Sequence, residues 1–421
     1  MPAGGTTLSG GMAAGGAAAA GSPTDAAGGS PLGGAAGAPA IDGPISGMVL
    51  HGGRPLAGVA VILNAGATTL TGKDGTFSFD DPGPSYRLVL VSSSGTFALV
   101  VDGMRKRQPR LQFSQTEPEC EGNIQGQLSG SVQGSILEGF VAADGEVLTY
   151  GSTVYNEPST YKLYADWRGP SAVGGKAVIL SALIGKYYQQ PIVPTQYLGY
   201  AEQPATVKCG GTATADVTMG PVTGQRELSG AISLPEGYHP SYPSLGIGPF
   251  EFDLHKLGAN YACSVPTDPA LSAGLRVTAY GDPPDLPFSS VTQTVPASGD
   301  LDFELPKAAI PILPATDTAG VTLATKFSWT APAERVVTYA RFQISPWTIL
   351  EVTEASETTI PDLTAYGFAL PKAADGSWGI EGRGPAASVD GAVELRDAVG
   401  NFVYSDAVYT RAEQRFFKTA P

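Results

Sequence analysis

From residue 44 onward, short apolar runs alternate with clusters of turn-forming residues. The stretch 71–83, TGKDGTFSFDDPG, is typical, because Asp74-Gly75 leads into TFSF at 76–79, where polar and apolar side chains alternate strictly. Alternation with a period of two predicts a half-buried strand, and an Asp-Gly pair before it predicts a hairpin turn. A calcium loop would need ligands at alternate positions and a closing glutamate. The pattern therefore predicts a turn at this point rather than a metal site.

The same alternation recurs through the chain. In TYARFQISP at 338–346, apolar Ala340, Phe342 and Ile344 alternate with larger polar or amphipathic neighbours. No segment sustains a helical period, and turn formers separate the apolar runs. We therefore predict an all-β protein of tandem Greek-key β-sandwich domains, with Trp329 and Trp378 in the core of the last one.

The first residues have a different composition. Of residues 1–40, 25 are Gly or Ala and only Asp25 is charged. Such a segment buries too little apolar area to offset its ordering entropy, so we expect a disordered Gly/Ala-rich tether over 1–43.

Repeated strand patterns suggest domain boundaries. IQGQLSGSV at 124–132 and RELSGAISLPEG at 226–237 both contain a Ser-Gly within a predicted first strand, and 305–318 is a proline-spaced linker. A repeat of this length favours tandem sandwiches over one large sheet. The predicted domains are 44–116, 117–222, 223–307 and 308–421.

Two of these ranges resemble known families. Gly47, the PLAGV run at 55–59, DGTF at 74–77 and YRL at 86–88 are similar to the carboxypeptidase regulatory-like domain, a transthyretin-like β-sandwich. The resemblance implies that fold for 44–116. The runs TKFSWTAP at 325–332 and GSWGIEGRG at 376–384 resemble a fibronectin type III or Ig-like domain, which we expect over 308–421. The tether resembles the spacer of bacterial surface lipoproteins, which implies an extracellular or cell-surface location, although no export signal is readable in this sequence.

Charge and apolar content exclude some functions. The net charge of −14 disfavours nucleic-acid binding, which needs a positive surface to displace counterions. No run of eighteen apolar residues is present, so we expect no transmembrane segment.

Motifs for catalysis are lacking. The three histidines are not in an HExxH motif, GxSxG does not occur, and GPSAVGGKA at 169–177 has Gly175 where a phosphate loop needs lysine. We therefore predict no enzymatic activity, no cofactor and no metal.

Aromatic residues concentrate in one region. Eight of the 17 tyrosines, joined by one tryptophan, lie within 150–200. Amphipathic rings suit both sugars and protein partners, whereas the structural alternative is that tyrosine is simply a good strand residue. Our candidate ligand-binding residues are Tyr155, Tyr161, Trp167, Tyr187 and Tyr188.

Two further features have alternative interpretations. MRKRQPR at 104–110 either meets an anionic polysaccharide or lipid headgroup, or is a solvated loop. Cys120 precedes the predicted first strand of 117–222 and Cys209 precedes its last. If these strands are parallel and adjacent, the two thiols can form a disulfide in an exported protein, with Cys263 left as a buried strand thiol. In a reducing compartment Cys120 and Cys209 would stay free.

Together these patterns favour a non-catalytic, secreted or surface-tethered modular binding protein. Carbohydrate is the favoured ligand class, with a polysaccharide, a cell-envelope component or another surface protein as the partner. Two alternatives stay open: a structural spacer or adhesin scaffold, and an accessory subunit of an extracellular enzyme system.

Overall fold

The structure is a computed structural model. It describes residues 43–421 except for 52, 65, 114–117, 144–146, 155–158, 185–192, 242, 255–257, 282–286 and 396–405.

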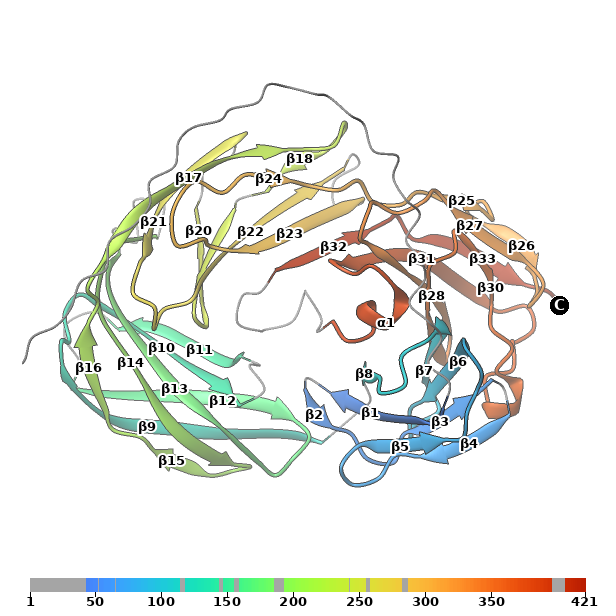
Figure 1. The fold of residues 1–421 in the computed structure, drawn as a ribbon, viewed down its shortest axis with the longest axis horizontal. Helices are drawn as coiled ribbons and strands as arrows, with labels where there is room; N and C mark the ends of the chain where they lie inside the picture. Colours follow the sequence, from blue (N-terminus) through green and yellow to red (C-terminus); the bar gives the residue numbers. More distant parts are fainter. Residues whose placement is uncertain are drawn as a thin grey trace, which may run out of the picture. The chain divides into compact units, whose positions relative to one another are not determined.

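Strands dominate the described residues, which confirms the predicted all-β class with several packed sheets (Figure 1). The helical elements among these residues are the short α1 (Val389–Ala392) and the 3₁₀ turn η1 (Thr364–Tyr366). The predicted tether at 1–43 lies outside the described residues apart from Gly43.

The largest sheet contains fifteen strands. Twelve follow one another in the order β20 (Phe250–Asp253), β19 (Ser244–Ile247), β22 (Ala273–Tyr280), β23 (Phe288–Thr294), β32 (Ala407–Arg411), β31 (Asp375–Gly384), β28 (Val337–Ile344), β29 (Trp347–Thr353), β7 (Phe97–Met104), β6 (Tyr86–Val91), β3 (Ala60–Leu63) and β4 (Ala67–Leu70). Three more branch from this path, β18 (His239–Pro240), β26 (Thr318–Val321) and β33 (Arg415–Thr419).

This sheet joins three of the four ranges that the sequence predicted as separate sandwiches. Strand β29 pairs with β7 in parallel, from Thr348 opposite Phe97 to Val352 opposite Val101. Strand β32 pairs with β23 in the antiparallel sense, with Arg411 opposite Phe288. The predicted domain boundaries are not tested by these pairings and stay a prediction.

The second sheet has eight strands and lies within 117–222. It contains β11 (Val147–Val154), β10 (Ser135–Ala142), β13 (Ala172–Ile184), β14 (Pro194–Lys208), β16 (Val217–Pro221), β9 (Glu119–Gly130), β12 (Thr160–Arg168) and β15 (Thr212–Thr214).

Three smaller sheets complete the fold of the described residues. Their strands are β2 (Arg54–Pro55), β1 (Ile45–His51), β5 (Thr76–Phe79) and β8 (Arg110–Gln112); then β21 (Asn260–Pro266), β17 (Gln225–Ser233) and β24 (Phe303–Glu304); then β25 (Pro311–Leu313), β27 (Lys326–Trp329) and β30 (Glu357–Thr359).

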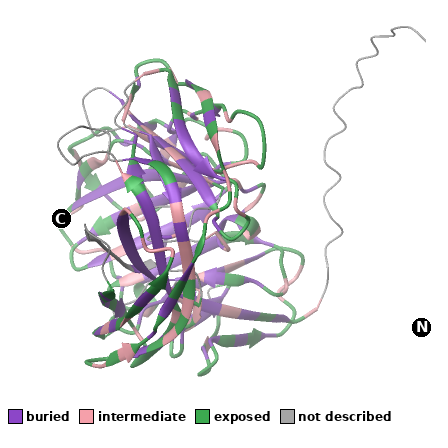
Figure 2. Cartoon of the chain, turned by 90° about the vertical axis from the view of Figure 1, so that its left-hand side faces the viewer, coloured by how far each residue is buried: buried purple, intermediate pink, exposed green. Residues whose placement is uncertain are grey.

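Buried and exposed residues alternate along many strands, as Figure 2 shows. In β12 every second side chain is buried and the others are exposed. The buried residues form four apolar clusters. Trp329 and Trp378 are both buried in the cluster formed mainly by the last range, as predicted.

The Asp74-Gly75 stretch forms a turn, but the turn does not close a hairpin. A carboxylate oxygen of Asp74 accepts hydrogen bonds from the Thr76 hydroxyl at 2.7 Å and the Thr76 backbone N–H at 3.2 Å, and Gly75 has a φ of +72°. The following strand β5 pairs with β1, whereas the preceding strand β4 belongs to the large sheet. The predicted hairpin is therefore wrong, because the turn carries the chain from one sheet to another.

Candidate functional site

One face of the large sheet carries a polar groove of about 320 Å³. This volume is at the lower end of the range for small-molecule sites. We call it the β22–β32 groove. Its lining residues are Ser241, Ser244, Glu251, Asp253, Arg276, Thr278, Tyr280, Phe288, Ser290 and Tyr409.

The groove forms because side chains on a strand alternate between two faces. On β22 the inward residues Leu275, Val277 and Ala279 are buried in the apolar core. Arg276, Thr278 and Tyr280 therefore point to the other face. Residues opposite one another on paired strands share a face, so the pairs Tyr280–Phe288 and Ser290–Tyr409 lie on this surface as well.

Three aromatic rings cross the groove. The ring centroids of Tyr280 and Phe288 are 5.2 Å apart and those of Phe288 and Tyr409 are 5.6 Å apart, both in edge-to-face geometry. Burial, followed by the nearby Glu381 carboxylate, raises the pKa of Tyr409 to about 12. The Tyr409 hydroxyl therefore keeps its proton at neutral pH and can donate a hydrogen bond.

Hydroxyl and charged groups border these rings. The Ser244 hydroxyl donates to Asp253 at 3.1 Å, and the Thr278 hydroxyl donates to Ser290 at 3.3 Å. Arg276 forms an ion pair with Glu251. Apolar rings beside several donors and acceptors can bind a molecule that has an apolar face and many hydroxyls.

A cluster of charges continues the same face on β31 and β28. Glu381 accepts from Arg341 at 2.8 Å and from Arg383 at 3.0 Å, and Arg383 also lies 4.5 Å from the centroid of the Tyr339 ring. Burial by itself would raise the pKa of Glu381, but the two guanidinium groups hold that pKa below its usual value. Glu381 is therefore an ionised carboxylate beside the groove.

Two of the sequence-based ligand candidates are buried. The side chains of Tyr161 and Trp167 are each 4% exposed and belong to the core of 117–222. The Tyr161 hydroxyl donates to the carbonyl of Ala215, and the Trp167 indole N–H donates to that of Pro170 at 2.7 Å. The Tyr161 ring is enclosed in the core, because odd-numbered residues of β12 point inward, whereas Trp167 also lines the cleft described below. This corrects the prediction for Tyr161, whereas the role of Trp167 as a ligand contact stays a prediction.

The other three candidates, Tyr155, Tyr187 and Tyr188, lie outside the described residues. Their role as ligand contacts stays a prediction.

The outward face of β12 borders a second, larger cleft of about 810 Å³. Tyr164 is 52% exposed there and its hydroxyl donates to Glu121, while Arg168 pairs with Glu119 at 2.8 Å. Exposed pairs of this kind contribute little energy and do not by themselves indicate a ligand. The tyrosine-rich stretch of the sequence therefore contains a strand, β12, in which some aromatic rings are buried in the core and others are exposed.

The β22–β32 groove could not be predicted from the sequence. Its rings come from three strands, and Phe288 and Tyr409 are far apart in the chain. No local motif connects such residues. Only the pairing of β23 with β32 brings them together.

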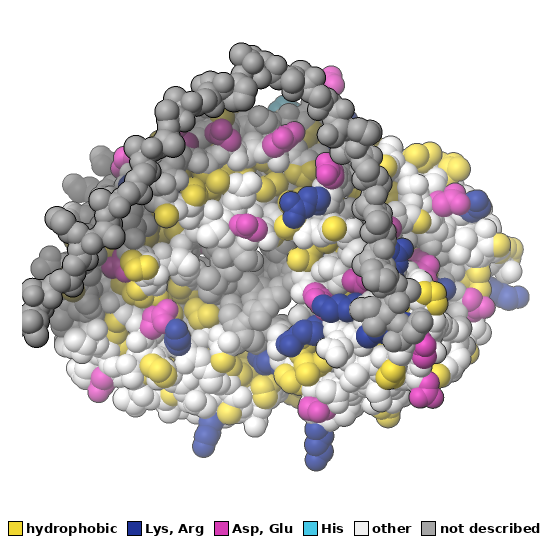
Figure 3. Space-filling model, in the orientation of Figure 1, with side chains coloured by type: hydrophobic (Ala, Val, Ile, Leu, Met, Phe, Trp, Pro, Cys, Tyr) yellow, Lys and Arg dark blue, Asp and Glu magenta, His cyan; other side chains and the backbone are white. Residues whose placement is uncertain are grey.

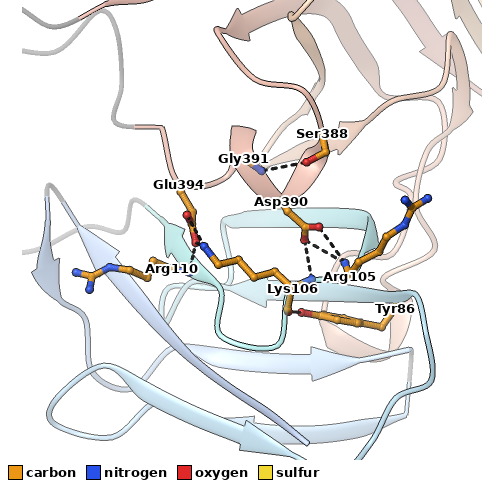
Figure 4. A network of polar contacts seen from close by, with 8 residues as sticks. All are labelled: Tyr86, Arg105, Lys106, Arg110, Ser388, Asp390, Gly391 and Glu394. Carbon is orange, nitrogen blue, oxygen red and sulfur yellow. Dashed lines mark hydrogen bonds and ion pairs between the residues drawn. The ribbon is translucent and has the colours of Figure 1, made fainter. Parts of the chain in front are cut away.

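The basic run at 104–110 is not a free solvated loop but packs against α1 (Figure 4). The backbone N–H groups of Arg105 and Lys106 donate to Asp390 at 3.0 and 3.1 Å, and Lys106 Nζ pairs with Glu394 at 2.6 Å. The Tyr86 hydroxyl donates to the Lys106 carbonyl. This segment therefore makes an internal contact between distant parts of the chain.

Cys120 and Cys209 form a disulfide, with their Cα atoms 5.0 Å apart. Strand β15 pairs in parallel with β9, with Thr212 opposite Asn123, and Cys209 lies in the turn just before β15. This is the strand arrangement on which the prediction depended. Cys263 is a buried free thiol whose pKa burial raises to about 12.

No family model matches the chain, and no curated protein matches it. The resemblance of 44–116 to the carboxypeptidase regulatory-like domain therefore stays a prediction. Within the described part of the chain, no helix is long and apolar enough to cross a membrane.

Several solved structures are similar to the chain at low levels. A Ca²⁺-stabilised, ice-binding adhesin of an Antarctic bacterium is 12% identical, with a TM-score of 0.15, and the match covers 87% of this chain and 98% of that one. The minor pilin GBS52 of Streptococcus agalactiae is 13% identical, with a TM-score of 0.17, over 43% of this chain and 97% of that one. The FN1–FN3 domains of chicken CNTN1 are 9% identical, with a TM-score of 0.17, over 70% of this chain and 100% of that one. At TM-scores this low, the matches carry no argument about this chain.

Proposed function

We propose that this chain is a non-catalytic binding protein of the cell surface or extracellular space, and that it binds carbohydrate in the β22–β32 groove. The observation that carries the proposal is the set of three adjacent rings, Tyr280, Phe288 and Tyr409, bordered by hydroxyl and charged side chains. A pyranose ring has an apolar C–H face that can stack on one of these rings, which lie edge to face with one another, and hydroxyls that pair with the groups beside them. The partner is then a polysaccharide or another component of a cell envelope.

The disulfide between Cys120 and Cys209 supports the extracellular part of the proposal. Disulfides persist in oxidising compartments and are rare where glutathione keeps thiols reduced.

The test is binding of the full chain to a panel of soluble and insoluble polysaccharides. We expect saturable binding that falls at least tenfold in a Tyr280→Ala/Tyr409→Ala variant. Tyr164→Ala is the matched control, because this exposed ring lies in the other cleft, and it should leave the affinity unchanged.

A Tyr187→Ala/Tyr188→Ala variant distinguishes binding in the groove from binding at these two residues, which the sequence suggested as ligand contacts. Loss of binding in this variant, with the groove variant unaffected, would contradict the groove as the site. A folded protein that binds no member of the panel would contradict the proposed function and favour a structural spacer.

A further inference from the structure

We propose that the ligand of the β22–β32 groove is an anionic saccharide, and that Arg411 binds its carboxylate. The inference depends on the proposed function and specifies the chemical class of the sugar.

Arg411 lies on the same face as the aromatic rings. It is two residues from Tyr409 on β32, and residues two apart on a strand share a face. It is paired directly with Phe288 on one side and with Glu381 on the other. Neighbouring strands are about 4.8 Å apart, so a sugar stacked on Phe288 or Tyr409 has its ring substituents within reach of the Arg411 guanidinium.

The guanidinium of Arg411 has no partner among the residues that the structure describes. The residue is exposed, and its side chain makes no hydrogen bond or ion pair with another residue of the described part of the chain. The adjacent carboxylate of Glu381 is already occupied, because Arg341 binds one of its oxygens and Arg383 binds the other. Arg276, at the other end of the groove, is paired with Glu251.

The charge around Arg411 is positive although the protein is acidic. Arg341, Arg383 and Arg411 lie around the carboxylate of Glu381, whereas the whole chain has a net charge of −14. Glu251 and Asp253 lie with Arg276 at the other end of the groove. Figure 3 shows that acidic and basic side chains are interspersed over the face drawn, without a broad basic surface. A local excess of arginine therefore favours one anionic group on a small ligand rather than a polyanion that covers the surface.

Arginine also favours a carboxylate by its geometry. The planar guanidinium presents parallel N–H groups that match the two oxygens of a carboxylate. A uronic acid combines this group with the C–H face and hydroxyls that the rest of the groove suits.

The test compares oligosaccharides of equal length by isothermal titration calorimetry of the full chain. The probes are oligogalacturonate, neutral cello-oligosaccharide and sulfated dextran oligosaccharide. We expect oligogalacturonate to bind at least tenfold more tightly than the neutral probe, and Arg411→Gln to abolish this preference. The neutral probe should bind the variant and the original protein equally.

Arg105→Gln is the matched control, because Arg105 is an exposed arginine of the 104–110 run and its guanidinium points away from the Asp390 network (Figure 4). It should leave all three affinities unchanged.

Equal binding of the uronate and neutral probes, or a preference that survives Arg411→Gln, would overturn the inference while leaving carbohydrate binding intact. A preference for the sulfated probe would overturn the assignment of a carboxylate. Absence of binding by every probe would instead count against the proposed function itself.

Discussion

Reducing the disulfide between Cys120 and Cys209 is expected to destabilise the 117–222 region strongly. The two residues are 89 positions apart, so the bond closes a loop that spans most of this region. In the chain-entropy model, opening a loop of this length lowers the free energy of unfolding by about 4–5 kcal/mol. That loss is comparable to a large part of the stability of a typical domain.

Reduction by a phosphine is preferable to substitution as the first perturbation, because it leaves all side chains in place. Hydrogen exchange followed by mass spectrometry would report the opening free energy of peptides from β9 and β12, which lie in this region. Cys263→Ala is the control, since the phosphine acts on the disulfide and this thiol is already free. This variant should lose as much stability on reduction as the original protein.

A fall of less than about 1 kcal/mol in the opening free energy of the β9 and β12 peptides would refute the reasoning. It would mean that the folded sheets, or residual structure in the unfolded chain, make the cross-link redundant.

Three further predictions follow from buried or crowded groups. Burial raises the pKa of Glu138 from its usual 4.5 to about 7, so between these pH values the folded state holds a proton that the unfolded state loses, and stability falls as the pH rises. Glu138→Gln should therefore add up to roughly 3 kcal/mol to the free energy of unfolding at pH 8 and nothing at pH 4. Equal gains at both pH values would contradict this. A Cβ at Gly126 would collide with the backbone carbonyl of Ala215, so Gly126→Ala should lower the midpoint of urea unfolding by an amount equivalent to about 1–3 kcal/mol. Gly174→Ala is the control and should leave the midpoint unchanged, because its Cβ would meet nothing closer than 3.7 Å. Asp390→Ala removes the carboxylate that accepts hydrogen bonds from the backbone N–H groups of Arg105 and Lys106. Hydrogen exchange of these two amides should therefore accelerate by roughly tenfold or more. Unchanged exchange would show that this contact does not hold the segment.

Much of the local structure was predictable from the sequence. The alternation in 76–79 and 338–346 predicted strands that are present as β5 and β28. Burial alternates as predicted in β5, whereas in β28 Thr338 and Tyr339 are buried as well, so that both faces of its first half are covered. The positions of Cys120 and Cys209 allowed a disulfide if the two neighbouring strands were parallel, and the structure has that arrangement, with Cys120 near the start of β9 and Cys209 just before β15. Each of these features depends on residues within one or two strands.

The partners of strands were harder to predict. The Asp74-Gly75 turn has the local geometry that its residues favour, yet β5 pairs with β1 rather than with the strand before the turn. Likewise, the tyrosine-rich stretch at 150–200 gave no information about which rings are exposed, because a shift of one position along β12 reverses the face of every side chain.

The sequence by itself therefore determined the all-β class, the strand periodicity, the core position of Trp329 and Trp378, and the acidic character that disfavours nucleic acid. Only the tertiary structure decided that β7 pairs with β29 and β23 with β32, and hence that Tyr280, Phe288, Tyr409 and Arg411 share one face. The physical reason is that alternation depends on neighbouring residues, whereas strand pairing depends on packing between segments far apart in the chain. No local sequence pattern therefore indicates which strands pair.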